Sequence, residues 1–258
     1  AIASGKGGVG KSTIAVNTAI WMAPRRPTVL VDGDLGTANA DVLCGLAPAR
    51  RLDAELFRTG EPDLASLLID TPWGFGLVPG AAGTADAAQL ETRQRSDFIR
   101  AIDRLGTPGD AVITDLGAGI GASVIETVAA SGLGVIVTTA EPSSLADAYA
   151  LIKCVTRHRG DPRPLGMGLV VNMIESRSVG RAVHDRIDRV CRRFLGGSMP
   201  LLGLIRRDRR VAASVRTRTP LLAGNPHGPA ARDLQNLADL IAAIAPRNRR
   251  SGTEDYRS

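Results

Sequence analysis

The feature that most constrains this chain is a glycine-rich string close to its beginning. Residues 5–12 read GKGGVGKS, which matches the phosphate-loop pattern GxxxxGK[ST]. An apolar run precedes the string and a helical stretch follows it, which is the context that such a loop requires. The glycines let successive backbone N–H groups converge on phosphate oxygens, and the following helix directs its positive dipole end at the same anion. The string therefore predicts a cradle for a nucleotide triphosphate.

The side chains of this loop have separate expected roles. Lys11 is expected to reach the β- and γ-phosphates, and the Ser12 hydroxyl to bind Mg²⁺. A glycine-rich turn without a ligand is the alternative. Residue usage argues against it, because the chain has 29 arginines but only three lysines, of which two lie in these eight residues. A compact ammonium is favoured there over a planar guanidinium. The residues predicted to contact the nucleotide at this loop are Gly5, Lys6, Gly7, Gly8, Val9, Gly10, Lys11, Ser12 and Thr13.

Short β-branched runs alternate with longer helical stretches along the chain, a pattern typical of a doubly wound α/β fold with a mostly parallel sheet. One strand is expected before the loop, and the others at residues 28–31, 75–78, 111–114, 134–138, 168–171 and 201–205. Helices are expected at residues 11–22, 87–105, 144–157, 179–194 and 230–245. With 258 residues, the chain suffices for one substantial domain. We predict a P-loop domain over residues 1–246 and a polar, arginine-rich tail over residues 247–258.

The composition excludes several classes of protein. No stretch without charged residues exceeds fifteen residues, so no membrane span is expected. Cys44, Cys154 and Cys191 are isolated from one another, which argues against a disulfide framework or a cysteine metal site and favours a reducing cytoplasm. The chain starts without methionine on what reads as a buried strand, so we expect further residues upstream.

Two later strings place acidic residues at the ends of predicted strands. Residues 32–36, DGDLG, follow strand 28–31 with Asp32 and Asp34, and residues 115–119, DLGAG, follow strand 111–114 with Asp115. Open α/β sheets bind their ligands at this edge, and nucleotide turnover needs acids that hold the metal's water shell and orient the attacking water. Helix caps and turn residues are the alternative interpretation.

Lys6 is unusual for an ordinary phosphate loop. Residues 6–13, KGGVGKST, resemble the deviant Walker A motif of the ParA/MinD superfamily, in which the early lysine reaches across a dimer to the partner's nucleotide. The resemblance implies an ATPase that uses ATP and Mg²⁺, hydrolyses ATP to ADP and phosphate as an ATP-dependent homodimer, and depends on Lys6, Lys11 and Asp34 for catalysis. A solvated surface lysine is the alternative for Lys6.

The resemblance also covers the acidic strings. DGDLGTANAD, residues 32–41, is similar to the family's switch I motif, which implies that Asp34 positions the hydrolytic water and that Asp32 supports Mg²⁺. DLGAGI, residues 115–120, is similar to switch II and implies that Asp115 contacts Mg²⁺ through water. Asn172 follows strand 168–171, where the family places an adenine-reading Asn, although a turn-forming Asn is nearly as good an interpretation. Arg206 departs from the family, which usually has proline there, so the base-pocket contacts of that loop stay open.

Finer features resemble the flagellar-number regulators of the FlhG/FleN type. They are DLGTANADVLCGL at residues 34–46, VPG at 78–80 and AEPSSLADAYALIK at 140–153. The resemblance implies a cytoplasmic switch that regulates flagellar number or placement with a protein partner, such as an SRP-type GTPase or flagellar components. Direct membrane binding is not expected, because the polar tail lacks an apolar stripe.

Other functions remain open at this point. Twelve arginines lie between Arg177 and Arg218, and they suggest non-specific DNA contact as in ParA-like partition ATPases. A solvated helix face explains them better, because the whole chain is rich in arginine. A septum-site regulator of the MinD type and a nucleotide-binding scaffold without hydrolysis are further alternatives.

Overall fold

The structure, a computed structural model, describes residues 1–52, 60–81, 90–107, 109–161 and 163–245. These residues form an eight-stranded sheet with the order β3-β4-β2-β5-β1-β6-β7-β8. All neighbouring strands pair in parallel except β3, which runs antiparallel to β4 at one edge. The predicted doubly wound, mostly parallel α/β fold is confirmed.

The bounds follow the order of the chain. The strands are β1 (Ile2–Ser4), β2 (Thr28–Gly33), β3 (Ile69–Asp70), β4 (Gly76–Val78), β5 (Ala111–Ala118), β6 (Gly134–Thr138), β7 (Met167–Ile174) and β8 (Leu201–Arg206). The helices are α1 (Lys11–Met22), α2 (Ala40–Leu43), the 3-10 helix η2 (Ala65–Leu67), α3 (Thr92–Arg104), α4 (Ala122–Ala130), α5 (Pro142–Arg159), α6 (Arg177–Leu195), α7 (Arg209–Thr217), α8 (Leu221–Gly224) and α9 (Pro229–Ile244).

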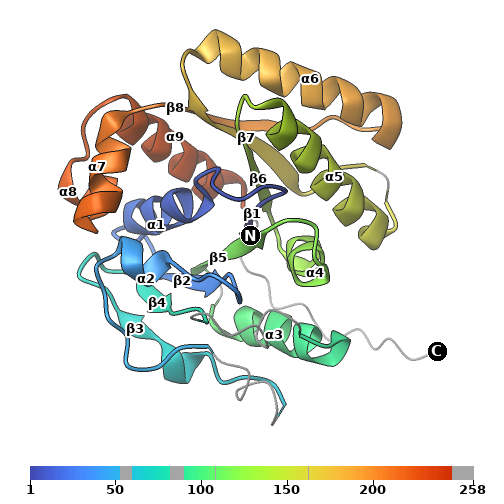
Figure 1. Ribbon diagram of the computed structural model, residues 1–258. Helices are drawn as coiled ribbons and strands as arrows, with labels where there is room; N and C mark the ends of the chain where they lie inside the picture. The colour runs from blue at the N-terminus through green and yellow to red at the C-terminus, as the bar shows by residue number, and fades with distance from the viewer. Residues whose placement is uncertain (53–59, 82–89, 108, 162, 246–258) are drawn as a thin grey trace.

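Helices cover both faces of the sheet, as Figure 1 shows. The helices α1 and α9 pack together on one face, where Ile14 and Leu234 join a buried cluster with strand residues such as Leu30. The helices α3, α4, α5 and α6 follow one another along the opposite face. The central strands are therefore buried on both sides, which explains their nearly continuous apolar sequence.

Several predicted bounds were wrong. Strand 168–171 continues to Ile174, so that Asn172 lies within β7 rather than after it, and β5 likewise continues through Asp115. The helix predicted from residue 87 begins at Thr92, where Glu91 and Gln94 form a capping box; residues 87–89 lie outside the described residues. The sequence interpretation missed α2, α4, α7, α8 and β3 altogether.

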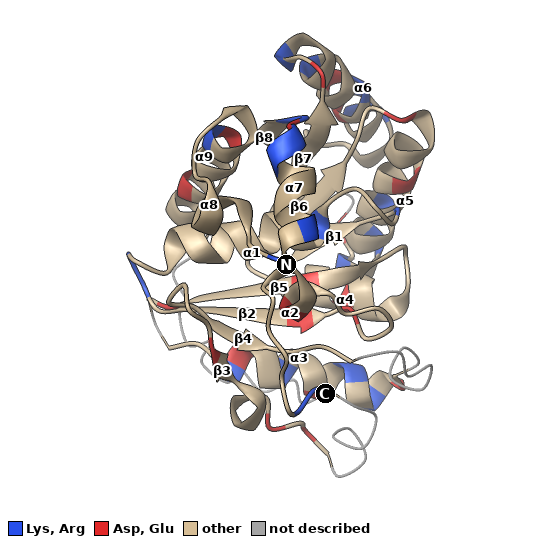
Figure 2. Cartoon of the chain, turned by 60° about the vertical axis from the view of Figure 1, so that its left-hand side comes forward, with Lys and Arg blue, Asp and Glu red and all other residues tan. Residues whose placement is uncertain are grey.

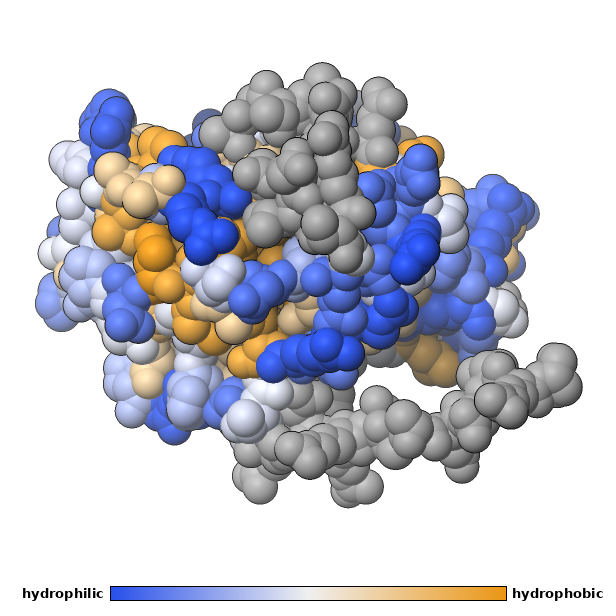
Figure 3. All heavy atoms as spheres, turned by 90° about the horizontal axis from the view of Figure 1, so that it is seen from below, coloured by the Kyte–Doolittle hydropathy of each residue, from blue (hydrophilic) through white to orange (hydrophobic). Residues whose placement is uncertain are grey.

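The predicted tail at residues 247–258 also lies outside the described residues. Among the helices that are described, none is long and apolar enough to cross a membrane. Seen from below, the surface over β3 and β4 has a band of apolar side chains with hydrophilic side chains around it (Figure 3). Leu68, which directly precedes β3, has an exposed apolar side chain.

Candidate functional site

The loop between β1 and α1 has the backbone conformation that its glycines predict. Gly8 and Gly10 have φ values of 77° and 91°, in the left-handed region where a side chain is strained. Gly10 ends the loop as the N-cap of α1, and a Cβ on it would lie 2.4 Å from Nδ2 of Asn172. The loop therefore depends on glycine both for its turn and for the close approach of β7.

Asp32 and Asp115 lie side by side beneath this loop. They are register partners on the neighbouring strands β2 and β5, and their exposed fractions are 0% and 1%. The Asp32 carboxylate accepts hydrogen bonds from the backbone N–H groups of Asn39 and Ala40, at 2.9 and 2.8 Å. These bonds tie the segment after β2 to the end of the strand.

Asp115 is the less satisfied of the two carboxylates. Its Oδ1 is buried without a hydrogen-bond partner, and the carboxyl group interacts with the Ser12 hydroxyl and the Lys11 ammonium. Burial, and secondly the charge of Asp32, raise the pKa of Asp115 to about 7. Burial also raises the pKa of Asp32 to about 6. A buried acidic pair with an unused oxygen beside a serine hydroxyl is an oxygen-rich donor set that suits Mg²⁺.

Asp34 is held at the opening of the site by the residues that follow it. Its Oδ1 accepts the N–H of Thr37 at 2.9 Å, and its Oδ2 accepts the Thr37 hydroxyl at 3.1 Å. A Cβ on Gly117, in the segment after Asp115, would lie 3.3 Å from Oδ1 of Asp34. The two acidic strings thus meet in space, as their positions at strand ends predict.

Lys6 points away from the buried acids. Its Nζ donates to Oε2 of Glu141 at 2.7 Å and to Oγ of Ser143 at 2.9 Å, both at the start of α5. The Lys6 and Glu141 side chains are 36% and 67% exposed. The ion pair lowers the pKa of Glu141. Lys6 is therefore held at the surface of its own chain, separate from Lys11.

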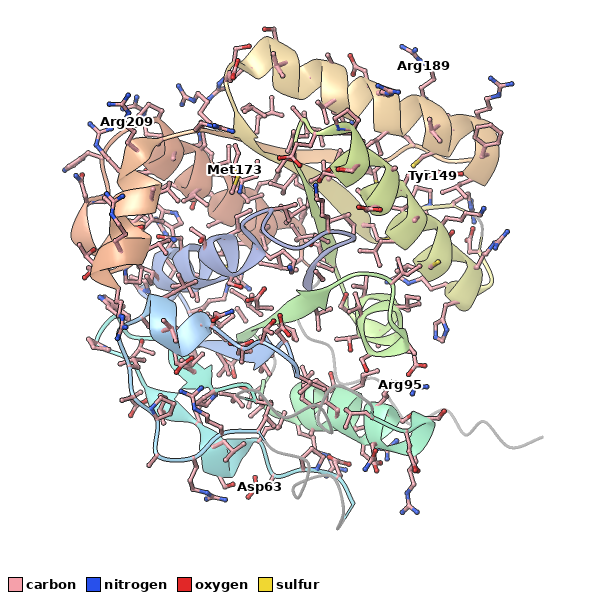
Figure 4. The ribbon with its side chains drawn as sticks, viewed as in Figure 1. Asp63, Arg95, Tyr149, Met173, Arg189 and Arg209 are labelled. Carbon is pink, nitrogen blue, oxygen red and sulfur yellow. The ribbon has the colours of Figure 1, made fainter. Side chains whose placement is uncertain are left out.

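A cavity of about 1260 Å³ lies against the phosphate loop and Asp34, whereas Lys6, Asp32 and Asp115 do not line it. Its lining includes Gly10, Lys11, Ser12, Thr13, Asp34 and Asn172, and it continues to Met173 and to the segment 205–208. The buried Asn172 amide donates from Nδ2 to the backbone oxygen of Val9 at 2.8 Å, and its Oδ1 accepts the N–H of Met173 at 2.8 Å. In Figure 4, Met173 at the end of β7 and Arg209 at the start of α7 mark the region beyond the loop.

Sequence reasoning missed some residues of this region. Glu141 lies in a string that was noted only for its resemblance, and its contact with Lys6 joins residues 135 positions apart. Asp233 on α9 binds Arg206 across 27 positions. In the sequence Arg206 was noted only as a departure from the resemblance, and that did not reveal its partner.

Known proteins resemble this chain over most of its length. The CobQ/CobB/MinD/ParA nucleotide binding domain family matches residues 1–221. The antiactivator FleN of Pseudomonas aeruginosa is 35% identical over 93% of this chain and 85% of its own. The flagellum site-determining protein YlxH of Helicobacter pylori is 31% identical over 94% of this chain and 81% of its own.

A solved structure shows the same fold. The septum site-determining protein MinD from Pyrococcus horikoshii, complexed with Mg-ADP, aligns with a TM-score of 0.77 at 21% identity, over 96% of this chain and 97% of its own. The predicted resemblance to the flagellar-number regulators is confirmed by the two flagellar relatives. The chain belongs to the CobQ/CobB/MinD/ParA family of nucleotide-binding proteins, in its MinD/ParA ATPase branch.

Proposed function

We propose that this chain is a Mg²⁺-dependent ATPase switch that dimerises when it binds ATP. The observation that carries the proposal is the buried Asp115, whose unpaired Oδ1 lies in a site with Ser12 and Lys11 at the start of α1. A buried charge with an unpaired oxygen is costly, so such a group favours a further bound cation. Ser12, Asp32 and Asp115 would hold Mg²⁺, which supplies positive charge against the triphosphate.

The backbone of residues 5–13 would bind the phosphates. The N–H groups at the start of α1 point at the anion, and Lys11, 8% exposed, would add its charge at the β- and γ-phosphates. Asn172 would lie toward the base, because it lines the cavity beyond Gly10. Its amide groups already bond within the chain, so we assign it to the wall of the base site.

Asp34 would orient the attacking water. Its carboxylate is fixed by Thr37 and Gly36, and it faces the segment after Asp115. A fixed carboxylate beside the terminal phosphate can accept a hydrogen bond from water and hold it in line. We expect Asp34→Ala to bind ATP but to hydrolyse it at least tenfold more slowly.

We assign Lys6 to the dimer. The Lys6–Glu141 pair is exposed, and exposed ion pairs contribute little to stability, so a phosphate on a second subunit can replace Glu141 at little cost. Lys6→Ala should keep ATP binding and lose turnover that depends on dimerisation. Lys153→Ala, which removes the third lysine from α5, is the matched control.

The experiment compares oligomeric state and turnover. Size-exclusion chromatography with ADP and with a non-hydrolysable ATP analogue should show a dimer only with the analogue. The specific ATPase rate should rise with protein concentration for the wild type and for Lys153→Ala, and stay at background for Lys6→Ala. Full turnover by Lys6→Ala would refute the role of Lys6.

We propose that the switch regulates flagellar number or placement through a protein partner, such as an SRP-type GTPase or flagellar components. The names of the two flagellar relatives, an antiactivator and a flagellum site-determining protein, support this process. Expression in Pseudomonas aeruginosa without FleN tests it. The wild type should restore the flagellar number and Lys11→Ala should not; failure of the well-expressed wild type would contradict the process but not the ATPase.

A second candidate function, non-specific DNA binding, has one observation in its favour. Figure 2 shows basic residues along α6 and at the end of β8, and Arg186 and Arg189 are exposed on α6. Four of the arginines are instead bound by carboxylates: Arg177, Arg192, Arg206 and Arg210. An ATP-dependent, salt-sensitive gel shift that Arg186→Glu with Arg189→Glu abolishes would favour DNA binding.

We place the protein in the cytoplasm, where ATP is abundant and its free cysteines, Cys44, Cys154 and Cys191, stay reduced. We still predict that the protein does not bind membranes directly. We also still predict a domain over residues 1–246 and a tail over residues 247–258.

A further inference from the structure

A buried carboxylate on α9 holds the end of β8. Asp233 accepts hydrogen bonds from Arg206 at three nitrogens: the backbone N–H at 3.1 Å, Nε at 2.7 Å and an Nη at 2.8 Å. Arg177, at the start of α6, donates to the same carboxylate at 3.1 Å. The Asp233 side chain is 1% exposed, and those of Arg206 and Arg177 are 28% and 58% exposed. The carboxylate is therefore fully partnered by two cations that reach it from other elements.

Arg206 contributes both its backbone and its side chain to this contact. A proline at this position has no N–H and could not donate the backbone bond to Asp233. Arginine supplies that bond and adds a bidentate side-chain contact, which fixes the orientation of the guanidinium against the carboxylate as well as the distance between them. The end of β8 is thus positioned by an ion pair.

The segment held in this way forms one wall of the nucleotide cavity. Arg206, Arg207 and Asp208 line the cavity, as does Met173 on the neighbouring strand β7. The N–H of Arg207 donates to the backbone oxygen of Ile174 at 2.8 Å, so the end of β8 also fixes the end of β7. Asp208 caps α7 through the N–H of Arg210 at 3.0 Å.

The other wall continues from β7 to the phosphate loop. Asn172 lies two residues before Ile174, and its amide donates to Val9 within the loop. Met173, between them, has φ 56°, a left-handed conformation that a non-glycine residue adopts only where its surroundings hold it. Asp233, Arg206, Ile174, Asn172 and Val9 thus form a continuous series of contacts from α9 to the P-loop.

We propose that Asp233 is a positioning residue that sets the base end of the nucleotide site, so that affinity for the adenine base depends on it while the phosphate cradle does not. The inference rests on the proposed ATPase function. The phosphate cradle is held separately, by its own glycines and by the start of α1, and Asp233 does not line the cavity. Loss of the carboxylate should loosen the 206–208 wall and leave the triphosphate contacts in place.

Asp233→Asn tests this with two probes in magnesium buffer: ATP, which has a base, and inorganic tripolyphosphate, which has none. Asp188→Asn is the matched control, because Asp188 on α6 also accepts from an arginine, at 2.7 Å, and from a backbone N–H, at 2.8 Å, but does not line the cavity. We expect Asp233→Asn to weaken ATP binding about tenfold relative to Asp188→Asn, with unchanged affinity for tripolyphosphate. In turnover, KM for ATP should rise and kcat should change little.

Two results would overturn the inference. One is equal ATP affinity in Asp233→Asn and Asp188→Asn, and the other is an equal loss for ATP and tripolyphosphate, which indicates general damage to the site. If Asp233→Asn does not fold, Arg206→Lys gives the same test, because lysine keeps the charge but cannot bind the carboxylate through two nitrogens. If the wild type binds neither probe, the proposed ATPase function fails instead; if it binds both and the variants behave as the control, only the role of Asp233 fails.

Discussion

Replacement of Asp115 by Asn should stabilise the nucleotide-free protein while it abolishes Mg²⁺-dependent turnover. The buried carboxylate has an unpaired oxygen and lies against a second carboxylate, Asp32. When no Mg²⁺ is bound, the negative charge of Asp115 opposes folding. Asparagine is neutral and nearly the same shape, so it removes this opposition together with the charge that would hold the metal.

The structure sets both the sign and the size of this effect. Its environment raises the pKa of Asp115 from 3.8 to about 7. Each pKa unit corresponds to about 1.4 kcal/mol, which gives an upper bound of about 4 kcal/mol. Asparagine loses part of the attraction to Lys11 and Ser12, so we expect a gain of about 2 kcal/mol above pH 7.

The gain should depend on pH in a defined direction. Below about pH 4 the carboxyl group is protonated in both the folded and the unfolded chain, so the charge has no effect. Between about pH 4 and pH 7 the unfolded chain loses this proton while the folded chain keeps it, so the free energy of unfolding of the wild type falls as pH rises. The advantage of Asp115→Asn should therefore grow over this interval and level off above it.

Urea unfolding at pH 5 and at pH 8 measures this advantage, without nucleotide and with EDTA. In thermal unfolding with Mg-ATP, the wild type should be more stable than Asp115→Asn, because binding of the nucleotide and metal should stabilise the wild type and not the variant. A variant that is less stable than the wild type at pH 8 without nucleotide, or a difference that does not change with pH, would refute the reasoning about the buried charge.

Two further predictions concern close packing. Gly10→Ala should abolish nucleotide binding in a titration with fluorescent ATP, because Gly10 has φ 91° and its Cβ would lie 2.4 Å from the side-chain amide of Asn172. The control Gly121→Ala, with no atom within 4 Å of its Cβ, should bind normally. Normal binding by Gly10→Ala would contradict the loop geometry. In a thiol-labelling time course on the native protein, Cys154 should react before Cys44 and Cys191. Those two thiols are buried, and burial raises their pKa values to about 12 and about 11. Faster labelling of either buried thiol would contradict this prediction and show that its environment opens.

Local patterns predicted the centre of the fold well. Helix α1 has the predicted bounds, because the glycine-rich loop directly before it marks its beginning. The central strands were found from their apolar runs, which burial on both faces demands. Asp32 on β2 and Asp115 on β5 also lie together as predicted, because these parallel strands pair in register at that point.

Elements with weak local signals were not predicted. Helix α7 has no buried residue, and α2 and α8 have four residues each, so none of them has a long apolar stripe. The strand β3 consists of two residues and depends on its pairing with β4. These elements are defined by tertiary contacts that a local pattern does not contain.

In the functional site, too, local patterns were predicted and tertiary contacts were not. The phosphate loop could be predicted because its glycines and lysines lie within eight residues of one another. The contacts that orient the rest, Lys6 with Glu141 and Arg206 with Asp233, join distant positions through long side chains. Charge alone could not select these partners among 32 basic and 26 acidic residues.

The central claim is that residues 5–12 bind a nucleotide triphosphate together with Mg²⁺, and calorimetric titration of the purified protein with ATP tests it most directly. In the presence of Mg²⁺ we expect saturable binding at one site per chain, which weakens strongly when EDTA replaces the metal and disappears in Lys11→Ala. A folded wild type that takes up no ATP, or one whose affinity is the same with Mg²⁺, with EDTA and without the Lys11 ammonium, would contradict the account.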